Sequence, residues 1–272
     1  MLSIHSLFKK KKDTPKRYHI IHLDECGSTN DVMREKAHEE KDAGPATYKD
    51  GQRPLLVVST EYQTKGRGQG TNTWESERGK NLLFSILCHP VWVPVAGQFV
   101  ISEAVALAIR DTLATLAEGF TIKWPNDIYW NDKKICGILI ENALGAGHIK
   151  YCIAGIGLNV NQEEFYSDAP NPVSLRQILG KDADREALLE DIAGRVSNNL
   201  DMLRNGNYAA IGSEYTSWLY RLHGFYPYRD AEGTFEAALV EVEDDGHLVL
   251  RDKADTIRRY AFKEVEFVIP KP

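Results

Sequence analysis

The spacing of apolar side chains predicts one regular helix in the first half of the chain. Apolar residues recur there close to the 3.6-residue helical period: Phe99, Ile101, Val105, Ala108, Ile109, Leu113 and Leu116. We therefore expect a helix over residues 98–117, with Gly119 just past its end. A more polar helix is expected from Ser28 to Glu40, and further helical segments over residues 184–204 and 207–221.

Short runs rich in apolar and β-branched residues predict strands on both sides of this helix. Those before it cover residues 18–23, 55–60 and 82–88, and those after it cover 121–124 continuing past the Pro125 break into 128–130, then 135–141 and 150–160. Turn signals at Asn131-Asp132 and Gly145-Ala146-Gly147 separate the later runs. These later strands should therefore be antiparallel neighbours.

From Gly224 onward the pattern changes to short alternating runs, such as residues 235–240 and 247–250. Hairpin signals at Glu232-Gly233 and Asp244-Asp245-Gly246 separate them, which is typical of a small β-barrel. The fold class predicted is α+β: a mixed, mainly antiparallel sheet with helices on one side, followed by a small β module. The expected domains are a basic lead-in (1–17), a main domain (18–223) and the β module (224–272).

The net charge and the apolar content argue against a general nucleic-acid binder and against a membrane-spanning protein. The 272 residues carry a formal net charge of −6, whereas a general nucleic-acid binder needs surplus Lys and Arg to neutralise phosphates. No apolar run approaches the ~18 residues of a membrane span. Lysines at 9–12 stand where a signal peptide would need its apolar stretch, and they fit either solvated charge or an interaction tail.

The cysteines are scattered, with no C-x-x-C pair: Cys26, Cys88, Cys136 and Cys152. This is typical of reduced, mostly buried thiols. We therefore expect a cytoplasmic protein with neither a membrane nor a nucleic-acid partner.

A glycine-rich stretch, residues 61–70, follows directly after a predicted strand and is the first candidate for chemistry. Glycines at 66, 68 and 70 let the backbone approach a ligand, and Arg67 offers a planar charged group that suits a carboxylate or phosphate. The stretch is neither a Walker loop, because no Lys-Ser/Thr follows, nor a dinucleotide fingerprint, because no helix follows. An ordinary flexible loop explains the spacing equally well.

Two lysine-containing stretches are further candidates. Residues 123–127, Lys-Trp-Pro-Asn-Asp, form a polar cluster suited to phosphates and their magnesium, or else a strand bulge whose Asn126 and Asp127 satisfy their own turn. Lys134 opens an apolar strand, with Gly137 leaving space nearby. It is either an edge lysine that prevents sheet aggregation or a charge aimed into a pocket.

Two polar stretches complete the candidates. In residues 155–161, glycines inside a strand mark close approach by a ligand or by another backbone, and Asn159 and Asn161 would face the same side. Residues 28–31, Ser-Thr-Asn-Asp, have the spacing of a capping box, while a helix N-terminus also receives polar or anionic ligands. No Ser-His-Asp or Cys-His arrangement can be defended. The shared chemistry is electrostatic stabilisation of phosphoryl and carboxylate charge.

Taken in order, these stretches resemble the biotin protein ligase family. The matching segments are Ser-Thr-Asn at 28–30, Glu-Tyr-Gln-Thr-Lys-Gly-Arg-Gly at 61–68 with Trp74, Lys-Trp-Pro-Asn-Asp at 123–127, Lys-Ile-Cys-Gly-Ile-Leu-Ile-Glu at 134–141, and Gly-Ile-Gly-Leu-Asn-Val-Asn at 155–161. The resemblance extends over residues 18–270, and it implies the class II synthetase-like catalytic domain of that family, with an SH3-like C-terminal domain.

The resemblance also implies an ATP-dependent activity, that of a biotin–[biotin carboxyl-carrier protein] ligase. The biotin carboxylate would attack the α-phosphorus of ATP, with magnesium present, giving biotinyl-5′-AMP and pyrophosphate. A lysine of a biotin carboxyl carrier domain would then take the biotinyl group. A lipoate-protein ligase and a non-catalytic biotin-binding protein are the alternatives.

Site roles follow from the resemblance, position by position. Lys134 and Arg67 are the implied catalytic residues, and the implied biotin-binding set is Ser28, Thr29, Asn30, Gln63, Arg67, Gly68, Gln69 and Lys134. Gly70 would let the loop fold over the ligand. The implied ATP side comprises Trp74, Lys123, Asn126, Asp127 and Asn159, with magnesium near Lys123 and Asp127 but no dedicated protein metal site.

This chain departs from the family pattern at position 69 and at its N-terminus. The family loop often carries a basic residue where this chain has Gln69, so we expect biotinyl-AMP to be retained less tightly. Some members carry an N-terminal DNA-binding helix-turn-helix, which 17 residues cannot form, so we expect a short form that acts as ligase only. An exposed sheet edge allows a homodimer, and neither the oligomeric state nor the identity of the carrier follows from the sequence.

Overall fold

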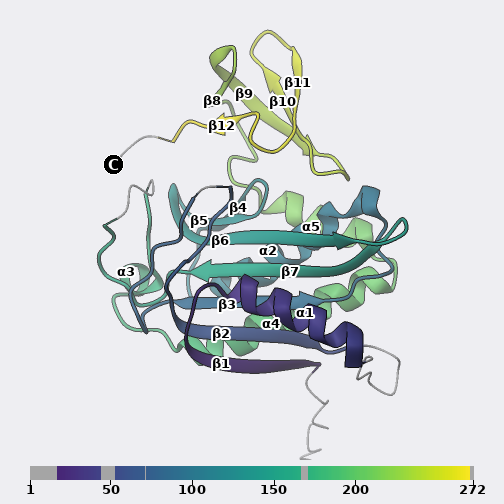
Figure 1. Ribbon diagram of the computed structural model, residues 1–272. Coiled ribbons are helices and arrows are strands. Elements are labelled where there is room, and N and C mark those ends of the chain that lie inside the picture. The colour runs from purple at the N-terminus through teal and green to yellow at the C-terminus, as the bar shows by residue number, and fades with distance from the viewer. Residues whose placement is uncertain (1–16, 44–52, 71, 167–170, 270–272) are drawn as a thin grey trace, which may run out of the picture.

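A seven-stranded sheet forms the centre of the protein (Figure 1). The computed structural model describes residues 17–43, 53–70, 72–166 and 171–269. The strands are β1 (Tyr18–Cys26), β2 (Leu55–Gln63), β3 (Leu82–Cys88), β4 (Phe120–Lys123), β5 (Asp127–Trp130), β6 (Lys133–Leu144) and β7 (Ile149–Leu158). Their order is β1-β2-β3-β7-β6-β5-β4, with β1 parallel to β2 and the other neighbours antiparallel, which confirms the mixed, mainly antiparallel sheet.

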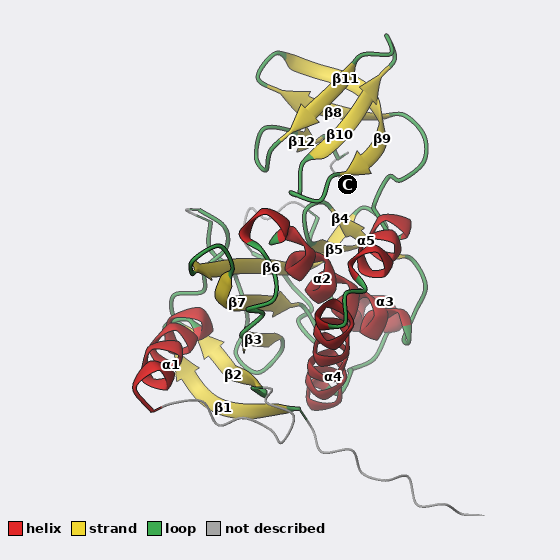
Figure 2. Cartoon of the chain, turned by 90° about the vertical axis from the view of Figure 1, so that its right-hand side faces the viewer, coloured by secondary structure: helices red, strands yellow, loops and turns green. Residues whose placement is uncertain are grey.

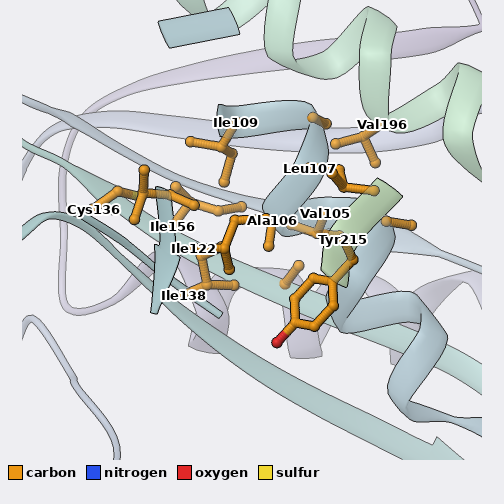
Figure 3. Close-up of a cluster of buried hydrophobic side chains, with 14 of the residues drawn as sticks. Val105, Ala106, Leu107, Ile109, Ile122, Cys136, Ile138, Ile156, Val196 and Tyr215 are labelled. Atoms are coloured by element: carbon orange, nitrogen blue, oxygen red, sulfur yellow. The ribbon is translucent and has the colours of Figure 1, made fainter. Parts of the chain in front are cut away.

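Most of the helices cover one face of this sheet (Figure 2). The helices are α1 (Thr29–Ala43), α2 (Phe99–Ala114), α3 (Leu175–Leu179), α4 (Arg185–Arg204) and α5 (Tyr208–Ser217), with a 3-10 turn at Val95–Gly97. Helix α2 is buried along nearly its whole length because the sheet, α4 and α5 surround it. Figure 3 shows this core, in which Leu107 and Ile109 of α2 lie with Ile138 of β6, Val196 of α4 and Tyr215 of α5.

Helix α1 packs on the opposite face of the sheet, which corrects the expectation of helices on one side. Neighbouring residues of a strand point to opposite faces, so Val57 faces the large core whereas Val58 faces α1. Met33 and Ala37, one helical turn apart, form the apolar stripe that meets Val58 and its neighbours. Two apolar residues were too few for a helical period to indicate which face the helix covers.

Three sequence expectations about the bounds of helices and strands needed correction. The long helix ends at Ala114 rather than residue 117, and the last expected helix ends at Ser217 rather than 221. The run 121–130 does not continue past Pro125: it reverses into a hairpin in which Lys123 pairs with Asp127. Proline lacks the N–H that a continuing ladder needs, so the chain turns there.

A second, five-stranded sheet follows the main one, which confirms the C-terminal β module. Its strands are β8 (Tyr226–Asp230), β9 (Gly233–Val242), β10 (Leu248–Asp252), β11 (Ile257–Tyr260) and β12 (Glu266–Phe267), in the order β11-β10-β9-β8-β12. It sits against the β4–β5 hairpin: the Trp124 indole N–H donates to the Gly246 carbonyl at 3.0 Å, and the Trp124 ring packs on Phe262. The domain boundary at residue 224 stays a prediction.

The cysteines of the chain lie mostly in the core. Cys88, Cys136 and Cys152 are buried, Cys26 is partly buried, and all four are free thiols, as expected. Within the described part of the chain, no helix has both the length and the apolar character needed to cross a membrane. The basic lead-in at residues 1–16 and the break at Gly44 lie outside the described residues.

Glu103 of α2 gives a pH-dependent stability that can be measured. The pKa of Glu103 is raised to about 7, mainly because the side chain is buried and secondarily because the Asp244 carboxylate lies nearby. An acid with a raised folded-state pKa binds its proton more tightly in the folded state, so the stability it contributes is lost as the pH rises from about 4.5 through about 7. We expect Glu103→Gln to flatten the fall in melting temperature over this window, while the exposed Glu118→Gln leaves the profile unchanged. Superimposable profiles for Glu103→Gln and wild type would contradict this assignment.

Candidate active site

A strip of glycines on the α1 side of the sheet forms the floor of the candidate site. Gly137 of β6 and Gly157 of β7 are direct cross-strand partners, and the indole of Trp74 lies over both. A Cβ at Gly137 would stand 2.9 Å from the indole, and one at Gly157 would collide with it. The buried indole N–H has no hydrogen-bond partner among the described residues. The glycines therefore keep a flat surface on which a planar group can lie.

Lys134 reaches this floor because of a bulge in β6. Tyr129 of β5 pairs with Lys134 and Ile128 with Cys136, so Ile135 is the extra residue. Ile135 and Cys136 both point into the core, and the Lys134 side chain comes within 3.3 Å of a Cβ placed on Gly137. Without the bulge, residues three apart would face opposite sides of the strand.

The Lys134 ammonium is held between a carboxylate and the indole. Its Nζ donates to Oδ2 of Asp127 at 2.6 Å and lies 6.0 Å from the Trp74 ring centre. The lysine side chain is 29% exposed, so the charge is sheltered but open to a ligand. Low dielectric surroundings strengthen the attraction of such a charge for an anion.

The predicted biotin-binding residues at the start of α1 gather at the other end of the floor. Ser28, Thr29 and Asn30 are buried. Gln63 Oε1 accepts from the Thr29 backbone N–H at 2.7 Å, so the end of β2 holds the first turn of α1. Asn30 lies directly over Gly155, where any Cβ would collide with its amide group.

Ser85 of β3 and Glu141 of β6 fix the orientation of Asn30, and the sequence reasoning did not assign either residue a role. The Ser85 hydroxyl donates to Asn30 Oδ1 at 2.5 Å, while Asn30 Nδ2 donates to Glu141 Oε2 at 2.7 Å. Ser85 also lies 2.7 Å from the Thr29 hydroxyl. A polar serine inside an otherwise apolar strand was the signal that could have identified it.

Arg67 belongs to a charged cluster at the same end of the site as Asn30. Its Nη2 lies 3.2 Å from Asp31 Oδ1 and 3.5 Å from Glu141 Oε1, and Arg34 binds both carboxylates as well. Asp31 therefore faces two arginines rather than closing a capping box. Lys134 and Glu141 are seven residues apart on β6, a span of roughly 20 Å between their Cα atoms. The two predicted cations thus border the same glycine floor from opposite ends.

Three of the predicted ATP-side residues belong to the β4–β5 hairpin: Lys123, Asn126 and Asp127. Lys123 lies against aromatic rings, with its Nζ 4.7 Å from the Phe267 ring centre, and burial lowers its pKa although Asp127 opposes the shift. Asn126 is buried and donates to the Ser102 hydroxyl at 2.8 Å. Both stand beside Asp127, so the hairpin brings these three residues together with Lys134.

Asn159 and Asn161 follow the end of β7 rather than lying within it, which corrects the expectation that they share a strand face. Asn159 donates to the Val173 carbonyl at 3.1 Å, and its Oδ1 is buried without a partner among the described residues. The Asn161 side chain binds the backbone of Ala183 through both its donor and its acceptor. Asn161 is therefore a structural residue, while Asn159 keeps a free acceptor.

The glycine loop after β2 stays irregular, as expected. Arg67 forms one isolated bridge to Thr73, and the Trp74 N–H donates to the Gly66 carbonyl at 3.1 Å, so the loop folds back on itself. Gly68 and Gln69 lie at its tip, where Gln69 is exposed and the Gly68 N–H donates to the Asn72 carbonyl at 2.8 Å. This fold places the loop and Trp74 over one edge of the glycine floor.

The site combines a flat floor, a polar end bordered by ion pairs, and an end that carries the Lys134 ammonium. Asn30, Thr29 and Ser85 offer hydrogen-bond donors and acceptors at one end, while Lys134 provides positive charge at the other. Such a site accommodates an elongated ligand with a polar head and an anionic tail. Among the described residues, the clustered metal-type ligands are Glu243, Asp245 and His247, which lie in the β9–β10 turn and not at this site.

Comparison with known proteins identifies the family. Residues 47–159 match the model of the Biotin/lipoate A/B protein ligase family. The chain is 27% identical over 249 residues to the bifunctional ligase/repressor BirA of Bacillus spizizenii, spanning 89% of this chain and 72% of that protein. It is 30% identical over 188 residues to the biotin–[acetyl-CoA-carboxylase] ligase of Mycobacterium tuberculosis, spanning 67% of this chain and 64% of that protein.

The fold comparison agrees with the sequence comparison. Biotin protein ligase from Aquifex aeolicus, solved in complex with biotin and ATP, superimposes with a TM-score of 0.72 at 25% identity, covering 93% of this chain and 99% of that one. The superposition therefore includes most of the chain. The chain belongs to the biotin protein ligase family.

Proposed function

We propose that this protein activates biotin with ATP to form biotinyl-5′-AMP and transfers the biotinyl group to a lysine of a biotin carboxyl carrier domain. The glycine floor between Asn30 and Lys134 is the observation that carries the proposal, because it offers a polar end for a ureido ring and a cation for a carboxylate. Family membership supplies the reaction, and the geometry supports the individual roles.

In the first half-reaction, the biotin carboxylate attacks the α-phosphorus of ATP and pyrophosphate leaves. The ureido ring lies at the Asn30 end, where Thr29, Asn30 and Ser85 form a hydrogen-bond network already held in place by Gln63 and Glu141. The valeryl chain extends from there toward Lys134, alongside the Trp74 indole that rests on Gly137 and Gly157. The Lys134 ammonium then meets the carboxylate and the α-phosphate oxygens, where negative charge accumulates in the transition state.

In the second half-reaction, the amine of the acceptor lysine attacks the acyl carbon of the mixed anhydride and expels AMP. The same Lys134 ammonium stabilises the negative charge that passes to the AMP phosphate. The anhydride is activated already, so the step needs no histidine base. Arg67, paired with Asp31 and Glu141, holds the loop against α1 and positions it over biotin.

Magnesium fits the residues beside Lys134 as an ion bound mainly by phosphates. Mg²⁺ commonly uses one or two protein carboxylates together with substrate phosphates, and Asp127 provides one carboxylate at the cationic end. When bound there, the ion would neutralise phosphate charge. Lys123 is itself a cation and cannot ligate Mg²⁺, so the Asp127 carboxylate is the charged group that would hold the ion.

Pyrophosphate–ATP exchange tests the proposed activity. We expect exchange of labelled pyrophosphate into ATP that depends on biotin and does not respond to lipoate. Exchange that depends on lipoate would replace the proposal with a lipoate ligase. Biotin binding without any exchange would indicate a binding protein that lacks catalysis.

Position 69 tests how well the intermediate is retained. Gln69 provides no charge at the tip of the loop, so we expect Gln69→Arg to slow the release of biotinyl-AMP several-fold, because a cation attracts the adenylate phosphate. Rapid filtration of enzyme loaded with labelled biotin measures the release. An unchanged release rate would contradict this role, and Ser213→Arg at an exposed position of α5 would show any general effect of added charge.

The carrier domain is the proposed macromolecular partner. The net charge of −6 favours a protein acceptor over a nucleic acid. β1 is an edge strand that could pair with a second copy of the chain, so a homodimer is part of the proposal. The four free thiols support a cytoplasmic setting.

A further inference from the structure

The C-terminal module brings a lysine to the glycine loop of the main domain. Lys263 stands in the turn between β11 and β12, and a Cβ placed on Gly70 would lie 3.0 Å from its ammonium nitrogen. Both residues have left-handed backbone conformations, with φ of +74° at Lys263 and +66° at Gly70. Residues some 190 positions apart in the chain thus face each other across the edge of the site.

Neighbouring contacts hold the Lys263 turn in this place. Phe262 packs on the Trp124 ring with 5.8 Å between ring centres, and Trp124 is itself anchored to the Gly246 carbonyl. Glu264 closes the turn, because its N–H donates to the Ala261 carbonyl and its carboxylate accepts from the Ala261 N–H. The turn is therefore fixed to the hairpin that carries Asp127.

Lys263 differs from the other cations of the site in its electrostatic surroundings. Arg67 faces the carboxylates of Asp31 and Glu141, and Lys134 faces Asp127. Lys123 lies among aromatic rings. Lys263 is exposed, and within the described ranges it forms no ion pair, since even the adjacent Glu264 carboxylate turns to a backbone N–H. Its charge is thus available to an anion.

We propose that Lys263 binds the phosphate oxygens of the ATP tail. This inference rests on the proposed function, which places the α-phosphate at Lys134. The β- and γ-phosphates would then extend past Asp127 toward Gly70 and Lys263, which lie beside each other at the edge of the site. Lys263 borders that space next to Gly70, at the end of the loop where Gln69 supplies no charge. The C-terminal module thereby contributes directly to nucleotide binding.

Three variants separate this role from a structural one. Lys263→Ala removes the charge, Lys263→Arg keeps it, and Lys253→Ala removes an exposed lysine of the same module whose partner is Glu236. Full-length protein is assayed by biotin-dependent pyrophosphate–ATP exchange, with KM measured separately for ATP and for biotin. Thermal unfolding of each variant reports whether the module stays folded.

The expected result is a split between the two substrates. Loss of one charge-assisted contact should raise the KM for ATP roughly tenfold in Lys263→Ala, with the KM for biotin within about twofold of wild type. Lys263→Arg should restore most of the ATP affinity, and Lys253→Ala should match wild type. An unchanged KM for ATP, or an equal rise for both substrates, would overturn the inference. Absence of exchange in the wild-type protein would instead refute the proposed function.

Discussion

Replacing Lys134 by alanine is expected to reduce adenylate formation by about 10²–10³-fold or more, and to weaken biotin binding by a smaller factor, because the biotin carboxylate also loses its cation. The Lys134 ammonium is the charge at the anionic end of the glycine floor, and its partner Asp127 would repel phosphate once the lysine is gone. The rate is read from pyrophosphate–ATP exchange and, in a single turnover, from the appearance of biotinyl-AMP.

The neighbouring Lys133 provides a matched control. It is exposed at the start of β6, so Lys133→Ala should retain wild-type exchange. Biotin binding, measured by calorimetry without ATP, should survive in both variants because the Asn30 end of the site is untouched. Normal turnover by Lys134→Ala would show that another residue carries the charge of the acyl-adenylate.

Adding a side chain at Gly157 is the second change with a large expected effect. The Trp74 indole already occupies the position that a Cβ would take, so Gly157→Val must displace either the indole or the ligand from the floor. Misplacement of reacting groups by about 1 Å can cost about 100-fold in rate. We expect at least that loss in exchange activity, with the KM for biotin also raised.

Gly194→Ala in α4 is the matched control for this change. The nearest atom to a Cβ at Gly194 is 4.0 Å away, so the new methyl group has room, and alanine favours a helix. The variant should keep full activity with equal or higher thermal stability. Wild-type kinetics in Gly157→Val would show that the ligand does not lie on the glycine floor.

Residues that lie close together in the sequence were the part of the site that could be predicted. Ser28, Thr29 and Asn30 begin α1, and the strand that starts at Lys134 follows the hairpin that carries Asp127, so local patterns already indicated their elements. The turn signal at Gly145-Ala146-Gly147 similarly indicated the antiparallel pairing of β6 with β7.

Features that depend on long-range pairing could not be predicted. The bulge at Ile135, which turns Lys134 onto the floor, exists only because β5 pairs with β6 in a shifted register. The link from Asn30 to Glu141 joins α1 to β6 across 111 positions, and no local pattern encodes it. The reversal at Pro125 was missed because apolar residues on both sides read as one continuous run.

Mass spectrometry of a biotin carboxyl carrier domain, incubated with this protein, ATP, magnesium and biotin, tests the central claim most directly. We predict that the carrier gains the mass of one biotinyl group on one lysine, and that omitting either ATP or biotin prevents the gain. A carrier that stays unmodified under these conditions, or that is modified only when lipoate replaces biotin, would contradict the account.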